Sequence, residues 1–199
     1  HDGPAARRFA EEVFAERAET PGPGSDSVAW AMRTLYLAAA RAATGFPIEA
    51  DAVTRAVSVA SRRDGGRFVG ELVLAQIGGE DARREARQAL EPELAPGVEP
   101  WRSVWARIAI GRSLLREAEE ADRRRGVLTL VAVHALHRDV SPYLAGIALA
   151  DAGVGSARLG DDRAAAVLVE ELRSEMPNHP VWEDPAVRGL RADGPGRTP

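Results

Sequence analysis

Hydrophobic and polar residues recur along most of this chain with the 3.6-residue period of amphipathic helices. In residues 5–19, for example, Phe9, Val13 and Phe14 share one face, while charged residues occupy the other. Stretches rich in Gly, Pro, Ser and Asp interrupt the periodic segments, and such stretches end helices. The pattern therefore predicts about nine helices. Those after the first are expected at residues 27–44, 50–63, 67–77, 80–91, 101–125, 127–136, 142–159 and 162–175.

One segment is ambiguous, because the apolar run from Val127 to Leu136 suits a buried strand as well as a buried helix. We predict a helix, since a lone strand would have no partner for its backbone hydrogen bonds and no second strand-like run occurs. Before this segment, two Glu–Arg pairs spaced four residues apart predict that the preceding helix continues to Arg125 and that Gly126 ends it. The predicted fold class is all-α, with antiparallel helical hairpins.

A proline-rich stretch divides the chain. Residues 91–100 hold three prolines and one glycine, which disfavour a continuous helix. We therefore predict an N-terminal helical half at residues 1–91, a linker at 92–100, a C-terminal helical half at 101–190 and a flexible tail at 191–199.

The clearest pattern lies between residues 149 and 177. It combines a small residue in a first helix, a glycine at the turn, an apolar i, i+4, i+7 stripe in a second helix and a final proline. These positions are Gly153, Gly160, Ala165, Val169, Leu172 and Pro177. The hairpin resembles one tetratricopeptide (TPR) repeat over about residues 146–180. The resemblance implies packing through these six positions, in either a short TPR-like α-solenoid or a compact helical bundle.

A degenerate second copy of this pattern precedes Pro142, with Leu128, Ala132, Ala135 and Leu136 at its packing positions. A poorer third copy lies near residues 77–86. Since about three units are the usual minimum for a stable stack, the irregular helices are expected to cap its ends.

Composition narrows the function classes. The 199 residues are 45% hydrophobic, and 30 acidic and 26 basic residues are interleaved, so no basic stripe favours nucleic acid as a partner. The sequence has no lysine and no cysteine, which excludes Schiff-base chemistry, thiol catalysis, disulfides and thiolate zinc sites. The bias toward Arg, Ala and Gly is typical of a GC-rich, bacterial genome.

Metal-ligating residues occur at one place, where His134 and His137 are three residues apart and Asp139 follows. This spacing can hold a metal ion, but a metal site usually takes a further ligand from another element. Partly buried, hydrogen-bonded histidines are the preferred interpretation. No nucleophile elbow or catalytic triad has a suitable local context. We therefore expect no metal, no cofactor and no catalytic residue.

The TPR resemblance also implies a binding groove lined by the first helices of successive repeats. Carried over by position, Ile147, Val154 and Arg158 would face this groove, and Arg112 and Arg116 would supply charge for an acidic partner. The alternative is that a neighbouring hairpin covers these apolar residues.

We expect a non-enzymatic protein–protein interaction scaffold, or an accessory structural subunit of a larger bacterial assembly. The alternative function is a small-ligand or metal-binding helical domain that uses His134, His137 and Asp139. The sequence begins with His1 rather than Met, and a cleaved export signal is one explanation. We favour an exported or periplasmic location over a cytoplasmic one. No apolar run reaches the 20 or so residues of a bilayer span, so partners are expected to be proteins, including those of membrane-attached or exported complexes.

Overall fold

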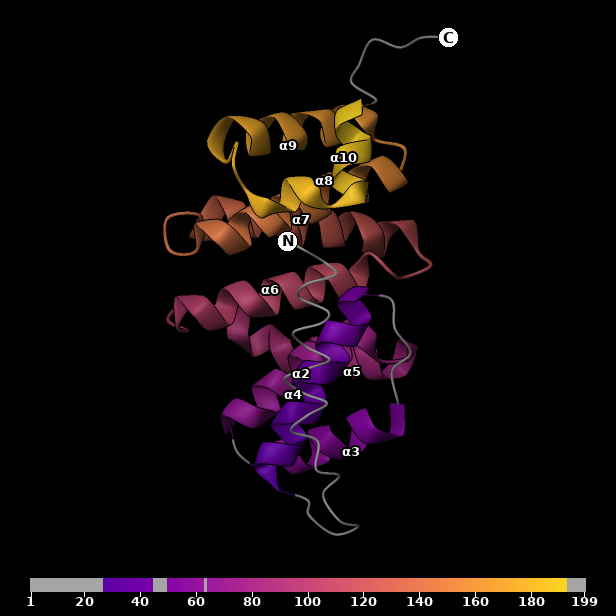
Figure 1. Ribbon diagram of the computed structural model, residues 1–199, viewed down its shortest axis with the longest axis vertical. Helices are drawn as coiled ribbons and strands as arrows, with labels where there is room; N and C mark the ends of the chain where they lie inside the picture. The colour runs from indigo at the N-terminus through magenta and orange to yellow at the C-terminus, as the bar shows by residue number, and fades with distance from the viewer. Residues whose placement is uncertain (1–26, 45–49, 63, 193–199) are drawn as a thin grey trace. The chain divides into compact units, whose positions relative to one another are not determined.

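The computed structural model describes residues 27–44, 50–62 and 64–192. Within these ranges the chain forms α-helices, short 3₁₀ segments and turns, and it contains no strand, which confirms the predicted all-α class (Figure 1). The helix predicted at residues 5–19 lies outside the described ranges. The chain divides into two compact units, residues 1–90 and 91–199, and each is described by itself.

The first unit contains α2 (Val28–Thr44), α3 (Ala50–Ala60), α4 (Asp64–Ile77) and α5 (Glu80–Leu90). Helix α2 begins where the hydroxyl of Ser27 accepts a hydrogen bond from the backbone N–H of Trp30 at 3.1 Å. Helix α2 packs against α3 and α4, and α4 also packs against α5. The core between α2, α3 and α4 consists of small and β-branched side chains with one leucine. Its buried members are Ala31, Leu35, Ala38, Val53, Ala56, Val59, Ala60 and Val73.

The boundary between α3 and α4 differs from the prediction. Residues 64–66, expected to separate the two helices, form the first turn of α4 instead. A Cβ atom on Gly66 would collide with the backbone carbonyl of Ala60, the last residue of α3. The glycine is therefore required by the close approach of the two helices rather than by helix termination.

The second unit begins with a 3₁₀ turn, η1 (Glu91–Leu94), followed by α6 (Pro100–Leu114), α7 (Glu120–His137), α8 (Pro142–Arg158) and α9 (Asp162–Glu175). Figure 1 shows these helices following one another in the order α6, α7, α8 and α9. Each packs on the next, and α6 also contacts α8. A second 3₁₀ turn, η2 (Pro180–Glu183), leads into α10 (Pro185–Ala192), which packs against α8 and α9.

The prediction of one continuous helix at residues 101–125 is wrong. Helix α6 ends at Leu114, and α7 begins at Glu120 and passes through Gly126 to His137. A Cβ atom on Gly126 would lie 2.9 Å from the carbonyl oxygen of Gly111 in α6. Gly126 thus allows α6 and α7 to cross closely and does not end a helix. The prediction that residues 127–136 are helical rather than extended is confirmed.

The hairpin expected from residues 149–177 is present as α8 and α9. Gly160 between the two helices has φ of +76°, a left-handed conformation that favours glycine. Asp161 then caps α9, because its Oδ1 accepts a hydrogen bond from the backbone N–H of Ala164 at 3.0 Å.

The end of the second unit was not predicted. The last helix was expected at residues 162–175 and a tail from residue 191, but η2 and α10 follow α9. Val187 of α10 is 3% exposed and belongs to a core cluster with Leu149, Ala150 and Leu172. Trp182 of η2 donates a hydrogen bond from Nε1 to the carbonyl of Met176 at 3.0 Å. Residues 180–192 therefore cap the α8–α9 hairpin. Residues 193–199 of the predicted tail lie outside the described ranges.

Candidate functional site

The three residues considered for metal binding do not come together. His134 is buried and faces α9. His137 faces α6, with its Nε2 3.5 Å from the hydroxyl of Ser103. The side chain of Asp139 is 96% exposed. Residues three apart differ by about 60° in direction around a helix axis, and here that difference directs the two imidazoles to different neighbouring helices.

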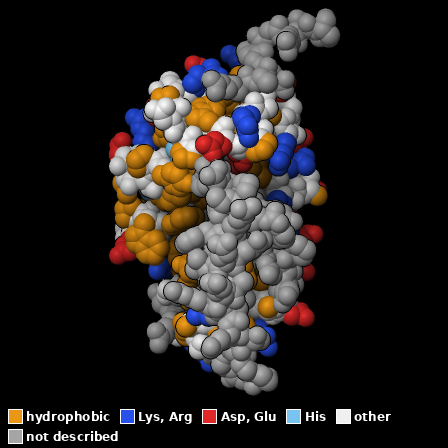
Figure 2. Space-filling model, in the orientation of Figure 1, with side chains coloured by type: hydrophobic (Ala, Val, Ile, Leu, Met, Phe, Trp, Pro, Cys, Tyr) orange, Lys and Arg blue, Asp and Glu red, His pale blue; other side chains and the backbone are white. Residues whose placement is uncertain are grey.

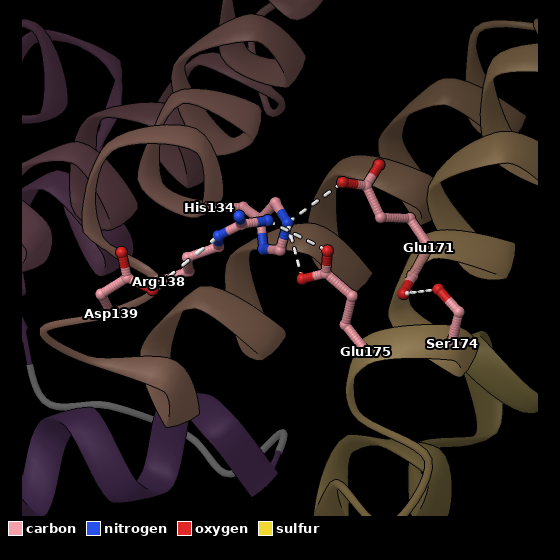
Figure 3. A network of polar contacts seen from close by, with 6 residues as sticks. All are labelled: His134, Arg138, Asp139, Glu171, Ser174 and Glu175. Carbon is pink, nitrogen blue, oxygen red and sulfur yellow. Dashed lines mark hydrogen bonds and ion pairs between the residues drawn. The ribbon is translucent and has the colours of Figure 1, made fainter.

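His134 instead meets two carboxylates of α9. Its Nε2 lies 3.1 Å from Oε1 of Glu171 and 3.3 Å from Oε2 of Glu175 (Figure 3). Arg138, one turn after His134 on α7, places Nη1 3.0 Å from Oε1 of Glu175. We call His134, Arg138, Glu171 and Glu175 the His134 cluster. It arises because an i, i+4 pair on α7 faces an i, i+4 pair on α9.

The His134 cluster is buried on one side and open on the other. The imidazole side chain is 5% exposed, whereas those of Glu171 and Glu175 are 41% and 35% exposed. The second ring nitrogen of His134, Nδ1, is buried and has no hydrogen-bond partner. The two carboxylates are therefore the polar contacts of the imidazole, and solvent reaches them from outside. Such a group can either tie α7 to α9 through charge or bind a cation.

A second polar contact joins α6 to α7 on the other side of α7. Ser103 is buried in α6, and its hydroxyl lies near His137. Burial lowers the pKa of the His137 imidazole, and the positive charge of Arg107 acts in the same direction. These two effects favour a neutral His137, and the residue lies beside a cation rather than a carboxylate.

The five predicted groove residues do not form one open surface. Arg112 donates from Nε to Oδ2 of Asp151 at 2.6 Å, which joins α6 to α8. Burial raises the pKa of the Asp151 carboxyl, and the Arg112 guanidinium opposes this shift. Val154 packs against the core cluster that includes Val187 of α10. Thus the protein's own C-terminal segment covers part of the expected groove. Ile147 is half-buried, while Arg116 and Arg158 are exposed.

The six predicted repeat-packing residues lie mostly at the α8–α9 contact. Ala165, Val169 and Leu172 are at most 5% exposed. A Cβ atom on Gly153 would lie 3.5 Å from Val169 Cγ2, an ordinary van der Waals distance. Gly160 forms the turn, and Pro177 is exposed just after α9. Tighter approaches occur at other glycines of α8. For example, a Cβ atom on Gly155 would lie 2.8 Å from Leu115 Cδ2.

Comparison with known proteins gives no relative. No protein-family model, no curated protein and no solved structure matches the chain. The case for a function must therefore come from the residues themselves. No helix within residues 27–44, 50–62 and 64–192 combines the length and apolar character needed to cross a membrane.

Sequence reasoning identified His134 as a candidate ligand but missed Glu171 and Glu175. A signal was available in their spacing. His134 and Glu171 are 37 residues apart, and so are Arg138 and Glu175. In a stack of helical hairpins, residues one hairpin apart lie on neighbouring helices of the same layer. A shared spacing of one hairpin length is thus a signal for contact.

Proposed function

We propose that the second unit is a non-enzymatic helical module that binds another protein, as a scaffold or an accessory subunit of a larger bacterial assembly. Its consecutive antiparallel helices give the arrangement in which TPR-like stacks present helix faces to partners. The carrying observation is an apolar stripe on the outer face of α7. The stripe consists of Leu128, Ala132, Ala135 and Leu136.

The α7 stripe is open although its residue types suit a core. Leu128 is 69% exposed and Leu136 is 61% exposed. The opposite face of α7 buries Leu130 and Val133 completely, so this helix is apolar on two sides. Figure 2 shows hydrophobic side chains gathered on the visible surface at the level of α6 and α7. Contiguous exposed apolar side chains on a folded protein favour a protein-binding surface.

Charge at one end of the α7 stripe indicates the character of the partner. Arg124 and Arg125 precede Leu128 by four and three residues and so share its face. Their side chains are 55% and 63% exposed and pair with the acidic residues Glu120 and Asp122 of α7 itself. Exposed pairs of this kind contribute about 0–1 kcal/mol and can be exchanged for others. The best-suited partner is an amphipathic helix with apolar residues along one face and carboxylates at one end.

The test compares partner capture by matched variants. Leu128→Ser together with Leu136→Ser removes the apolar stripe, whereas Tyr36→Ser removes a side chain that is 55% exposed in the first unit. Each protein is affinity-purified from its own organism, followed by mass spectrometry and sedimentation analysis. We expect wild type and Tyr36→Ser to retain a stoichiometric partner and the double variant to lose it. A photo-crosslinking residue in place of Ala132 should attach to that partner.

Two results would contradict this function. Retention of the partner by the double variant would show that the stripe is not the binding surface. Catalytic turnover by the purified protein without any partner would exclude a purely non-enzymatic role. Circular dichroism of the double variant provides the folding control, because substitutions at exposed positions usually change stability by less than about 0.5 kcal/mol.

A further inference from the structure

The His134 cluster has more hydrogen-bond acceptors than its imidazole can serve. Nε2 of His134 faces an oxygen of Glu171 and an oxygen of Glu175. An imidazole nitrogen carries at most one hydrogen in either protonation state, so it donates a linear hydrogen bond to only one of them. The other ring nitrogen, Nδ1, is buried and has no hydrogen-bond partner. Rotating the ring away from the two carboxylates would therefore bring the imidazole no alternative hydrogen bond. One carboxylate oxygen therefore faces a nitrogen that cannot fully satisfy it.

The charge of the cluster also favours an added cation. Glu171 and Glu175 are four residues apart on one helix, a spacing at which like charges repel. Arg138 compensates one of these charges through Oε1 of Glu175, which leaves Oε2 directed at His134. The two carboxylates and the guanidinium together carry a net charge of −1. A cation between the three ligand atoms would relieve this repulsion.

The distances suit a small transition-metal ion. One nitrogen of His134 and one oxygen each of Glu171 and Glu175 lie within 4.8 Å of one another. Tetrahedral zinc has bonds of about 2.0–2.2 Å, which places neighbouring ligand atoms about 3.3–3.5 Å apart. The two nitrogen–oxygen distances, 3.1 and 3.3 Å, are close to this value. The two carboxylate oxygens lie within 4.8 Å of each other, and rotation of the half-exposed glutamate side chains can bring both of them to an ion bound at His134.

We propose that His134 Nε2, Glu171 Oε1 and Glu175 Oε2 bind one divalent transition-metal ion of the zinc type, with water as the remaining ligand. The buried imidazole supplies a fixed nitrogen ligand, and the half-exposed carboxylates leave a path from solvent. Arg138 is a positioning residue that orients Glu175, as outer partners of metal ligands commonly do. A nitrogen ligand favours zinc over magnesium or calcium, which prefer oxygen ligands. This site differs from the one considered from sequence, where His137 and Asp139 were the partners.

The experiment measures zinc binding to the full chain by isothermal titration calorimetry, in competition with a chromophoric chelator. All proteins carry His1→Ala, so that this histidine, which lies outside the His134 cluster, adds no zinc ligand of its own. We expect one Zn²⁺ per chain and at least about 10-fold weaker binding for Glu171→Gln and for Glu175→Gln. The matched control is Glu170→Gln, which makes the same chemical change at a neighbouring residue that pairs with Arg173. It should bind zinc as tightly as the parent protein.

A second readout is stability. At a Zn²⁺ concentration 100-fold above the dissociation constant, the unfolding equilibrium constant should fall about 100-fold, and Mg²⁺ should have no such effect. His134→Ala should abolish both the binding of Zn²⁺ and the stabilisation by Zn²⁺. If the His134→Ala protein does not fold, zinc binding by Glu171→Gln and Glu175→Gln still tests the proposal. The proposal is overturned if the parent protein binds no stoichiometric Zn²⁺ in the micromolar range. It is equally overturned if Glu171→Gln binds zinc as well as Glu170→Gln does.

Discussion

Replacing Gly126 by alanine probes the close crossing of α6 and α7 in the second unit. A Cβ atom at this position of α7 would lie 2.9 Å from the carbonyl oxygen of Gly111, 3.0 Å from Leu114 Cβ and 3.1 Å from the backbone nitrogen of Leu115. These atoms, in α6 and just after it, belong to the backbone or are fixed to it, so no side-chain rotation can relieve the contact. The two helices must move apart, and the buried side chains between them must repack.

The expected magnitude follows from two opposing effects. Overpacking of a well-packed core costs about 1–3 kcal/mol. Alanine in place of glycine inside a helix gains about 1 kcal/mol from helix propensity. Because the contacted atoms are fixed to the backbone, the upper part of this range, about 2–3 kcal/mol, applies here. We therefore expect Gly126→Ala to lower the free energy of unfolding by about 1–2 kcal/mol. Gly153→Ala is the matched control, since its Cβ would meet Val169 Cγ2 at an ordinary 3.5 Å. There the propensity gain remains, and stability should rise by about 0.5–1 kcal/mol.

Urea unfolding followed by circular dichroism measures both variants, with the shift in midpoint at an unchanged m-value as the readout. In thermal unfolding, 1 kcal/mol corresponds to about 4–8 °C for a domain of 60–100 residues. A Gly126→Ala protein as stable as wild type would show that α6 and α7 do not cross at this glycine. A Gly153→Ala protein that loses 1 kcal/mol or more would show that α8 approaches α9 more closely than described.

Two charged pairs give further predictions. Glu93 of η1 forms a two-point pair with Arg102 of α6, and these hydrogen bonds hold the pKa of the Glu93 carboxyl below its ordinary value of 4.5. Glu93→Gln should lower the free energy of unfolding by about 1–3 kcal/mol at neutral pH. This loss should shrink as the pH falls through the folded-state pKa of Glu93, because the wild-type carboxylate is then protonated. A loss that stays the same at every pH in urea titrations would contradict this. At Asp151 burial raises the pKa above 3.8, so its contribution to stability is complete below pH 3.8 and is lost as the pH rises through the folded-state pKa. The free energy of unfolding of wild type, relative to that of Asp151→Asn, should therefore decrease as the pH rises from 3.8 through the folded-state pKa. If unfolding measured at several pH values shows an increase instead, the raised pKa of Asp151 is refuted.

Local signals in the sequence were sufficient for most helices. Ser27, Pro142, Gly160 and Asp161 each carry a start or stop signal whose mechanism is local, and the corresponding helix ends lie within a residue or two of the expected positions. Glycine was the main source of error. Gly126 was interpreted as a helix end, but it lies inside α7 because α6 crosses there. Sequence alone does not distinguish a glycine that ends a helix from one that admits a neighbour.

Features that depend on tertiary contacts were predicted less well. The short helix α10 contains Gly189 and begins at Pro185, so its local pattern resembles that of a tail. Val187 orders it by packing into the α8–α9 core. The outward direction of Leu128 and Leu136 was also missed, because the repeat pattern placed them at packing positions. Which face of α7 is buried depends on its neighbours, and the buried residues there are Gly126, Leu130, Val133 and His134.

Two polar contacts of the second unit connect helices that are one hairpin apart. His134 of α7 reaches Glu171 of α9 over 37 residues, and Arg112 of α6 reaches Asp151 of α8 over 39 residues. Alternate helices thus form two layers, and a polar contact connects the helices of each layer. A hairpin repeat brings the same helix faces together in every unit. An i, i+4 pair such as His134 and Arg138 therefore lies opposite the i, i+4 pair one hairpin later, which here is Glu171 and Glu175. In such stacks, polar sites are more readily found by searching at the hairpin spacing than by searching within one helix.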